Sequence, residues 1–147
     1  MSDGNARVLP HVAACFNAQG LMRSIGAEMT EAAEGRCVIE MPWSEQVTQQ
    51  DGLFHGGISA SIADVACGHA AMSMMPVGHN PLTVEFKHNL LAPAMGDRLR
   101  ATANVIKSGR TLTVVGAKVE VRRDGQYHHC AEMLATMIGL ASRGERT

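Results

Sequence analysis

The sequence contains one long helical pattern, which begins at Gly57 and is ended by Pro76. Larger side chains recur in it at the three- and four-residue spacing of one helix face, at Ile58, Ile62, Val65, His69 and Met72. The opposite side carries almost only small residues, namely Gly57, Ala60, Ser61, Asp64, Gly68 and Ala71. Another backbone or a ligand can approach such a side closely. We therefore expect a fold built around this helix, with Asp64 on a surface away from the core and His69 on the core side.

Strand patterns surround this helix on both sides. Before it, Pro10 to about Ile25 predicts a short helix interrupted near Gly20, and two strands are expected over 27–33 and 36–41. After it, strands are expected over 82–91, from about 98 to 105, from about 113 to 122 and from about 127 to 140, with Asp124-Gly125 as a hairpin turn. Residues 1–9 and 142–147 read as loose ends. The order predicts an α+β fold, an antiparallel sheet with one central helix laid on it.

Length and composition limit the class of protein. A chain of 147 residues forms a single domain, predicted over 1–147 with its core at about 20–140. The net charge of −1 and the few aromatic residues argue against a nucleic-acid partner. No apolar run approaches the roughly 20 residues of a membrane helix, and the polar N-terminus has no signal-peptide pattern. The four cysteines are widely spaced, which fits neither a zinc site nor a disulfide framework, so a cytoplasmic location is expected.

The start of the long helix combines two groups that acyl transfer requires. The glycine pair Gly56-Gly57 exposes backbone N–H groups at a helix N-terminus, where they can stabilise negative charge on a carbonyl oxygen. Asp64 follows on the same helix among small and apolar residues, and a carboxylate there is costly unless it has a partner or a task. A structural acid at a subunit contact is the alternative explanation of Asp64.

Several motifs together resemble the hotdog-fold thioesterases, specifically the PaaI-like branch of the phenylacetate pathway. The similarity covers roughly residues 20 to 140. It rests on Gln49-Gln50-Asp51-Gly52-Leu53-Phe54-His55-Gly56-Gly57, Asp64, Gly68, Leu82-Thr83-Val84-Glu85-Phe86-Lys87, the segment 89–94 and Ser108-Gly109-Arg110-Thr111. The resemblance implies a hotdog fold, in which an antiparallel sheet wraps around one long helix.

The same resemblance implies roles for individual residues. Asp64 matches the catalytic carboxylate, acting as nucleophile or as general base for water, and Gly57 matches the residue whose N–H polarises the thioester carbonyl. His55 matches the motif histidine at this turn, where it either contacts the thioester or only satisfies a backbone group. Gln49 and Thr83 fall where relatives orient the thioester or the attacking water. The family builds its site across a subunit interface, so a homodimer or homotetramer is expected.

The remaining candidate residues concern substrate binding and metals. Gly56 and Asn89 are expected to contact substrate, and Lys107 and Arg110, which flank a turn, are candidates for the phosphates of coenzyme A. His128 and His129 alternate across a strand and cannot form a metal pair. No cofactor or metal is expected, because a thioester is already activated.

The sequence thus predicts an acyl-CoA thioesterase that releases coenzyme A from a small, medium-chain or aryl acyl-CoA. Two alternatives stay open. One is a non-catalytic hotdog sensor that binds acyl-CoA, although the chain shows no DNA-binding extension. The other is a hotdog hydratase or dehydratase acting on enoyl thioesters, from whose Asp and His spacing this motif departs.

Overall fold

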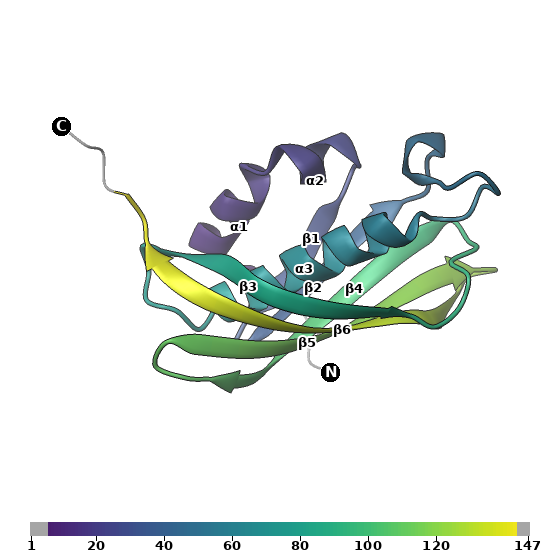
Figure 1. Ribbon diagram of the computed structural model, residues 1–147. Coiled ribbons are helices and arrows are strands. Elements are labelled where there is room, and N and C mark those ends of the chain that lie inside the picture. Colours follow the sequence, from purple (N-terminus) through teal and green to yellow (C-terminus); the bar gives the residue numbers. More distant parts are fainter. Residues whose placement is uncertain (1–5, 144–147) are drawn as a thin grey trace, which may run out of the picture.

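The computed structural model describes residues 6–143 and contains three α-helices, one short 3-10 helix and six strands (Figure 1). The helices are α1 (Pro10–Asn17), α2 (Gly20–Ser24), η1 (Glu45–Val47) and α3 (Gly56–Met72). The strands are β1 (Glu28–Ala33), β2 (Arg36–Pro42), β3 (His79–Leu90), β4 (Arg98–Ser108), β5 (Leu112–Arg123) and β6 (Gln126–Ala141). The predicted order of elements and the α+β class are confirmed.

All six strands form one antiparallel sheet in the order β1-β2-β4-β5-β6-β3. The sheet curves around α3, which lies along its inner face (Figure 1). β3 follows α3 in the sequence but pairs with β6, so it forms an edge of the sheet. Pro81 is tolerated within β3 because an edge strand has one unpaired side.

The core lies between α3 and the inner face of the sheet. The predicted alternation is confirmed in β5 and in the first half of β4, up to Ala103, where every second residue is buried. The small residues Ala63, Ala66 and Ala70 of α3 are fully buried, which lets the sheet approach the helix closely. The small side of the helix is less open than predicted: Gly68 and Ala71 are also buried, and Pro81 of β3 lies against Gly68.

The N-terminal segment contributes more to the fold than the sequence indicates. The backbone of Arg7 and Leu9 pairs with Ala32 of β1, so the part of residues 1–9 that the structure describes is not a loose end. Val12 and Phe16 of α1 belong to the buried core, which therefore reaches beyond the predicted start at about residue 20. Residues 1–5 and 144–147 lie outside the described residues.

Two boundaries are set by local chemistry. The hairpin predicted at Asp124-Gly125 joins β5 to β6, and both residues have positive φ angles, 51° and 75°, as a two-residue hairpin turn requires. The helix α3 begins one residue before the predicted start and ends at Met72, after which the backbone continues in turns up to Pro76.

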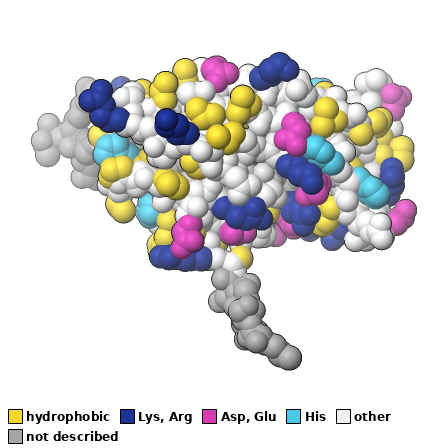
Figure 2. Space-filling view, turned by 90° about the horizontal axis from the view of Figure 1, so that it is seen from below, with side chains coloured by type: hydrophobic (Ala, Val, Ile, Leu, Met, Phe, Trp, Pro, Cys, Tyr) yellow, Lys and Arg dark blue, Asp and Glu magenta, His cyan; other side chains and the backbone are white. Residues whose placement is uncertain are grey.

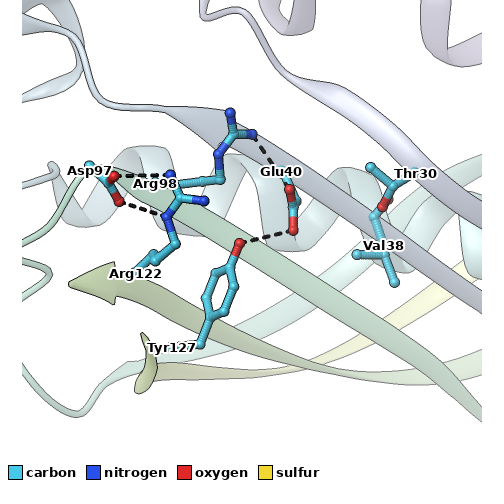
Figure 3. Close-up of polar contacts among 7 residues, drawn as sticks. All are labelled: Thr30, Val38, Glu40, Asp97, Arg98, Arg122 and Tyr127. Carbon is cyan, nitrogen blue, oxygen red and sulfur yellow. Dashed lines mark hydrogen bonds and ion pairs between the residues drawn. The ribbon is translucent and has the colours of Figure 1, made fainter. Parts of the chain in front are cut away.

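On the outer face of the sheet, seen in Figure 2, exposed hydrophobic side chains gather toward one end, which we call the apolar half, and charged side chains are denser over the rest, the charged half, although both kinds occur in each. The apolar half carries exposed side chains of β3, β4, β5 and β6, namely Leu82, Val84, Ile106, Leu112, Leu134 and Leu140. In the charged half, opposite charges pair across strands. Glu40 accepts hydrogen bonds from Tyr127 and Arg98, and Arg122 makes two bonds to Asp97 (Figure 3). These charges largely satisfy one another, whereas Asp64 and the glycine turn lie on the α3 side of the sheet.

The four cysteines are free thiols. Among the described residues, no helix combines the length and apolar character needed to cross a membrane.

Candidate active site

His55 caps the N-terminus of α3. Its backbone is extended, and its Nδ1 accepts a hydrogen bond of 2.9 Å from the N–H of Gly57. Because Nδ1 accepts, the proton of the neutral ring sits on Nε2, where the exposed imidazole can donate a hydrogen bond outward. The predicted polarising amide of Gly57 therefore already has an acceptor within its own chain.

The N–H of Gly56 points out of the helix. The carbonyl oxygen of His55, in the same peptide group, accepts from the N–H groups of Ile58 and Ser59 at 2.9 and 3.3 Å. In a trans peptide the carbonyl and the N–H point in opposite directions. Within residues 6–143, this N–H finds no hydrogen-bond acceptor. It lies at the partly positive end of the helix, which favours developing negative charge.

A cavity of about 360 Å³ opens beside this amide. Its wall is mostly apolar, with Gly56, Gln49 and Ser59 among its few polar contributors; the other lining residues are Leu53, Phe54, Leu90, Leu91, Ala92, Pro93, Ala94 and Cys130. Leu90 lies so close to Gly56 that a Cβ atom there would come within 2.6 Å of its Cδ1. An apolar cavity with few polar groups suits an acyl chain. A larger groove, of about 680 Å³, lies among the paired charges of the outer face and includes none of the catalytic candidates.

Gln49 shapes one wall of the cavity. Its Oε1 accepts hydrogen bonds from the backbone N–H groups of Asp51 and Leu53, and its Nε2 donates to the Asp51 carboxylate at 3.4 Å. The side chain thus holds the loop before α3 in place. The second N–H of its amide has no acceptor among the residues that the structure describes.

Asp64 lies two turns further along α3 and is half-buried against β3. Thr83 Oγ1 donates a 2.8 Å hydrogen bond to its Oδ1. Burial raises the pKa of the Asp64 carboxyl above its usual 3.8, and the hydrogen bond from Thr83 opposes that rise. Its second oxygen accepts no hydrogen bond from residues 6–143. A carboxylate with a raised pKa and an available oxygen is suited to accept a proton or to attack a carbonyl carbon. The structure thus brings Thr83 and Asp64 together.

Asp64 and Gly56 do not meet within one chain. They are eight residues apart on one helix, which corresponds to about 12 Å along its axis. Asp64 is not among the residues that line the cavity beside Gly56. One carbonyl group therefore cannot contact both residues within a single subunit.

The predicted substrate-binding residues lie in three places. Gly56 lines the cavity, as described. Asn89 lies on the outer face of the sheet, where it accepts a 2.7 Å hydrogen bond from Lys87, and the same chain does not bring it to the cavity. Arg110 lines a groove near the end of α3 that is remote from Gly56, and Lys107 is exposed close to it, near the end of β4.

Sequence reasoning missed a polar pair beneath the glycine turn. Ser59 is 2% exposed; its Oγ donates to the carbonyl of Gly56 at 2.8 Å and lies 2.9 Å from Nε2 of His88. Burial lowers the pKa of His88. The available signal was the histidine itself, because it falls at a β3 position that faces the apolar core.

Other titratable groups near the helix have structural explanations. His69 is buried, as predicted; its Nδ1 donates to the carbonyl of Val65 at 2.7 Å, and its ring meets Phe16 edge to face. Burial and the nearby Asp64 raise the pKa of Cys67 to about 12, so this thiol stays protonated. His128 and His129 are both exposed. No group of metal-ligating side chains is found in the described part of the chain.

Comparison with known proteins identifies the family. The profile of the thioesterase superfamily matches residues 51–128, which include the α3 glycine turn, Asp64 and Thr83. A protein of Halobacterium salinarum named "Putative esterase" is 34% identical over 71% of this chain and 72% of its own length. Human acyl-coenzyme A thioesterase 13 is 26% identical over 78% of this chain and 83% of its own length.

Solved structures share the fold. A thioesterase family protein from Silicibacter pomeroyi superposes with a TM-score of 0.88 at 42% identity, over 90% of this chain and 97% of that one. A Bacillus halodurans protein crystallised with CoA gives 0.76 at 29% identity, over 86% and 82%. PaaI of Escherichia coli, 22% identical, gives 0.80 over 90% and 92%, which shows the expected fold. The chain belongs to the thioesterase superfamily and has its hotdog fold.

Proposed function

We propose that this protein is an acyl-CoA thioesterase that hydrolyses a small, medium-chain or aryl acyl-CoA to the free acid and coenzyme A. The observation that carries the proposal is a half-buried carboxylate with a raised pKa, Asp64, on the same helix as the unpaired amide of Gly56. These are the two groups that thioester hydrolysis needs, and the apolar cavity beside Gly56 has room for the acyl group.

In the proposed mechanism the role predicted for Gly57 passes to Gly56. The thioester carbonyl oxygen accepts a hydrogen bond from Gly56 N–H, because Gly57 N–H is used by His55. Nε2 of His55 supplies a second donor near the same turn. Asp64 of the other subunit either takes a proton from the attacking water or attacks the carbonyl carbon itself, while Thr83 holds its carboxylate. When Asp64 acts as the base, the carbon–sulfur bond breaks and the proton held by Asp64 passes to the departing sulfur, so coenzyme A leaves as the thiol. When Asp64 attacks, the acyl group stays on its carboxylate as a mixed anhydride, a water molecule supplies the proton of the thiol, and a second water hydrolyses the anhydride to the free acid.

A homodimer joined at β3 supplies the second subunit in this proposal. β3 is a 12-residue edge strand, and such an edge is normally protected or paired. Phe86 and Leu90 lie on the α3 side of β3, yet 44% and 63% of their surface is exposed. A partner subunit would cover these side chains and place its own α3 nearby. A further pairing of dimers into a tetramer stays a prediction.

The proposed substrate class follows from the cavity and from the relatives. The apolar wall favours an uncharged acyl group, and coenzyme A is the thiol in the Bacillus halodurans structure and in the name of the human relative. Arg110 and Lys107 are candidates for the phosphates of coenzyme A, and Asn89 remains a candidate contact from the outer face. The proposal needs no metal or cofactor, and the cytoplasmic location stays a prediction.

The test is release of free thiol from a panel of acyl-CoAs, with Gly56→Ala and Gly56→Pro compared. Both variants add a Cβ beside Leu90, but only proline removes the N–H, and His55 already has the backbone angles (φ −63°, ψ 135°) that a residue before proline adopts. We expect kcat of Gly56→Pro to lie about 10²–10³-fold below that of Gly56→Ala. Equal rates would contradict the assigned amide.

Two readouts distinguish the alternatives. Tight binding of acyl-CoA by the wild type without thiol release would identify a sensor. Loss of enoyl absorbance without free thiol would identify a hydratase.

A further inference from the structure

We propose that His88, acting through Ser59, is a positioning residue for the glycine turn at the start of α3. The inference rests on the proposed function, because it concerns the amide that would polarise the thioester carbonyl. Neither residue is among the catalytic groups assigned above. Their side chains come from different elements, α3 and β3, and meet at 2.9 Å beneath the cavity.

The hydrogen atoms of this pair can be assigned from its partners. Ser59 has one hydroxyl proton, which it donates to the carbonyl of Gly56 at 2.8 Å. Its oxygen is therefore an acceptor toward His88, so the proton of the His88 ring lies on Nε2. Nδ1 of His88 is buried and finds no partner in the described part of the chain. The opposite tautomer would bury an unpaired N–H there, which is a costly arrangement.

The resulting chain of bonds fixes one peptide group from both sides. Its carbonyl, from Gly56, accepts from Ser59, and its N–H, from Gly57, donates to His55 Nδ1 at 2.9 Å. Two adjacent glycines are otherwise the most flexible pair a chain can contain. Fixing this peptide also fixes the direction of the neighbouring Gly56 N–H, which faces the cavity.

The position of His88 indicates that the pair has a task beyond packing. His88 pairs with Met133 of β6, and its side chain points to the same face as the buried Met133 and Ala135. An apolar residue would fill this place without burying an unpaired nitrogen. A polar network that is only partly satisfied lowers stability, so its cost is expected to be matched by a functional gain.

The experiment compares four variants with the wild type on the best acyl-CoA substrate. Ser59→Ala and His88→Met break the chain, and we expect each to lower kcat about 10-fold with KM changed less than twofold, as for a reacting group misplaced by a fraction of an ångström. The side chain in His88→Gln carries an N–H donor three bonds from Cβ, the same separation as Nε2 of histidine. This variant should therefore restore kcat to within about threefold of wild type. The double variant should be no slower than the slower single variant, because the two residues act as one unit.

Ser61→Ala is the matched control. Ser61 Oγ makes the same kind of bond to a backbone carbonyl of this turn, to Gly57 O at 2.8 Å, but no histidine contacts it. Its removal should leave kcat within twofold of wild type. Thermal unfolding of every variant checks that the chain remains folded.

Amide exchange of Gly57, followed by NMR without substrate, tests the same chain independently of activity. Exchange should accelerate in Ser59→Ala and His88→Met but not in Ser61→Ala. The inference is overturned if kcat of both chain-breaking variants stays within twofold of wild type, if the losses multiply in the double variant, or if His88→Gln is as slow as His88→Met. A wild type that releases no thiol overturns the proposed function instead, and unchanged Gly57 exchange in Ser59→Ala then overturns the inference by itself.

Discussion

Asp64 is costly to the fold, and in the proposed mechanism the same side chain performs the chemistry. The carboxylate is held by one hydroxyl, from Thr83, while burial opposes its ionisation. The folded protein therefore binds the Asp64 proton more tightly than the unfolded chain does. This contribution to stability is fully present below the unfolded pKa and is lost as the pH rises through the folded-state pKa.

Replacing Asp64 by Asn should separate the effect of this side chain on stability from its effect on kcat. Asn cannot ionise and still accepts the Thr83 hydrogen bond, so we expect it to raise Tm at pH 7 by about 2–4 °C, the shift that 1 kcal/mol produces in a domain of this size. The gain should shrink as the pH is lowered from 7 to 4, because a growing fraction of Asp64 is then protonated in the wild type. The same variant should lose about 10²–10⁴-fold in kcat. Calorimetry at both pH values and thiol release check the prediction; an active variant would contradict the role of Asp64.

Replacing Thr83 by Val should move the acid limb of the pH–rate profile. The hydrogen bond from Thr83 lowers the pKa of Asp64, and Val of the same shape cannot donate it. The pKa of Asp64 should therefore rise further, and the acid limb of kcat/KM, which reports the free enzyme, should shift to higher pH. An unchanged limb would show that Asp64 is not the titrating group.

Individual residues also mark where sequence reasoning was sufficient and where it was not. The motif around His55 predicted the glycine turn, but only the structure shows that the His55 ring occupies the Gly57 amide. Side-chain caps of this kind depend on rotamers that a sequence does not specify. Ser59 and His88 are 29 positions apart and meet only through tertiary packing, so the sequence did not predict their contact either.

The secondary structure elements were easier to predict than the site. Alternating strands such as β4 and β5 carry a period-two pattern that reports the buried face directly. The helix α3 was found by its spacing, yet its small side proved to be partly buried, with Pro81 of β3 lying against Gly68. A stripe of small residues indicates close approach, but does not say whether the approaching group is the chain's own strand or a ligand.

The β5–β6 hairpin offers a test of an element that is separate from the site. Gly125 has a φ of 75°, which a β-branched residue adopts only with strain, and a Cβ there would meet open space. Gly125→Val should therefore destabilise the protein by about 1–2 kcal/mol through the backbone alone. Denaturant unfolding measures this loss, and kcat at low temperature should stay unchanged. A loss of kcat without a loss of stability would contradict this separation.

At the scale of the whole molecule, a site shared between two subunits was predicted only from the resemblance to the family. Asp64 and Gly56 are separated by about 12 Å of helix within one chain. In the proposed dimer, a second copy would lie on the exposed edge β3 and cover Phe86. Subunit contacts leave little trace in a single sequence, because an exposed apolar residue on an edge strand looks like a core residue.

Introducing a charge at this edge should abolish both assembly and activity. Phe86→Asp places a carboxylate where the proposed partner would cover an aromatic ring. We expect a folded monomer in light scattering, with thiol release reduced at least about 10²-fold, since an intact Asp64 and Gly56 would no longer meet. Val77→Asp, at an exposed position outside β3, is the control and should leave the assembly unchanged. A fully active Phe86→Asp monomer would contradict the shared site.

The most direct measurement mixes two inactive proteins. Asp64→Asn lacks the carboxylate and Gly56→Pro lacks the amide, so neither homodimer has a complete site. After unfolding and refolding together in equal amounts, half of the dimers should be mixed, and each should contain one site with both groups intact. Thiol release should therefore recover to about a quarter of the wild-type rate, because half of the dimers are mixed and one of the two sites in each mixed dimer is complete. No recovery in a mixture shown to contain mixed dimers would contradict a site shared between subunits.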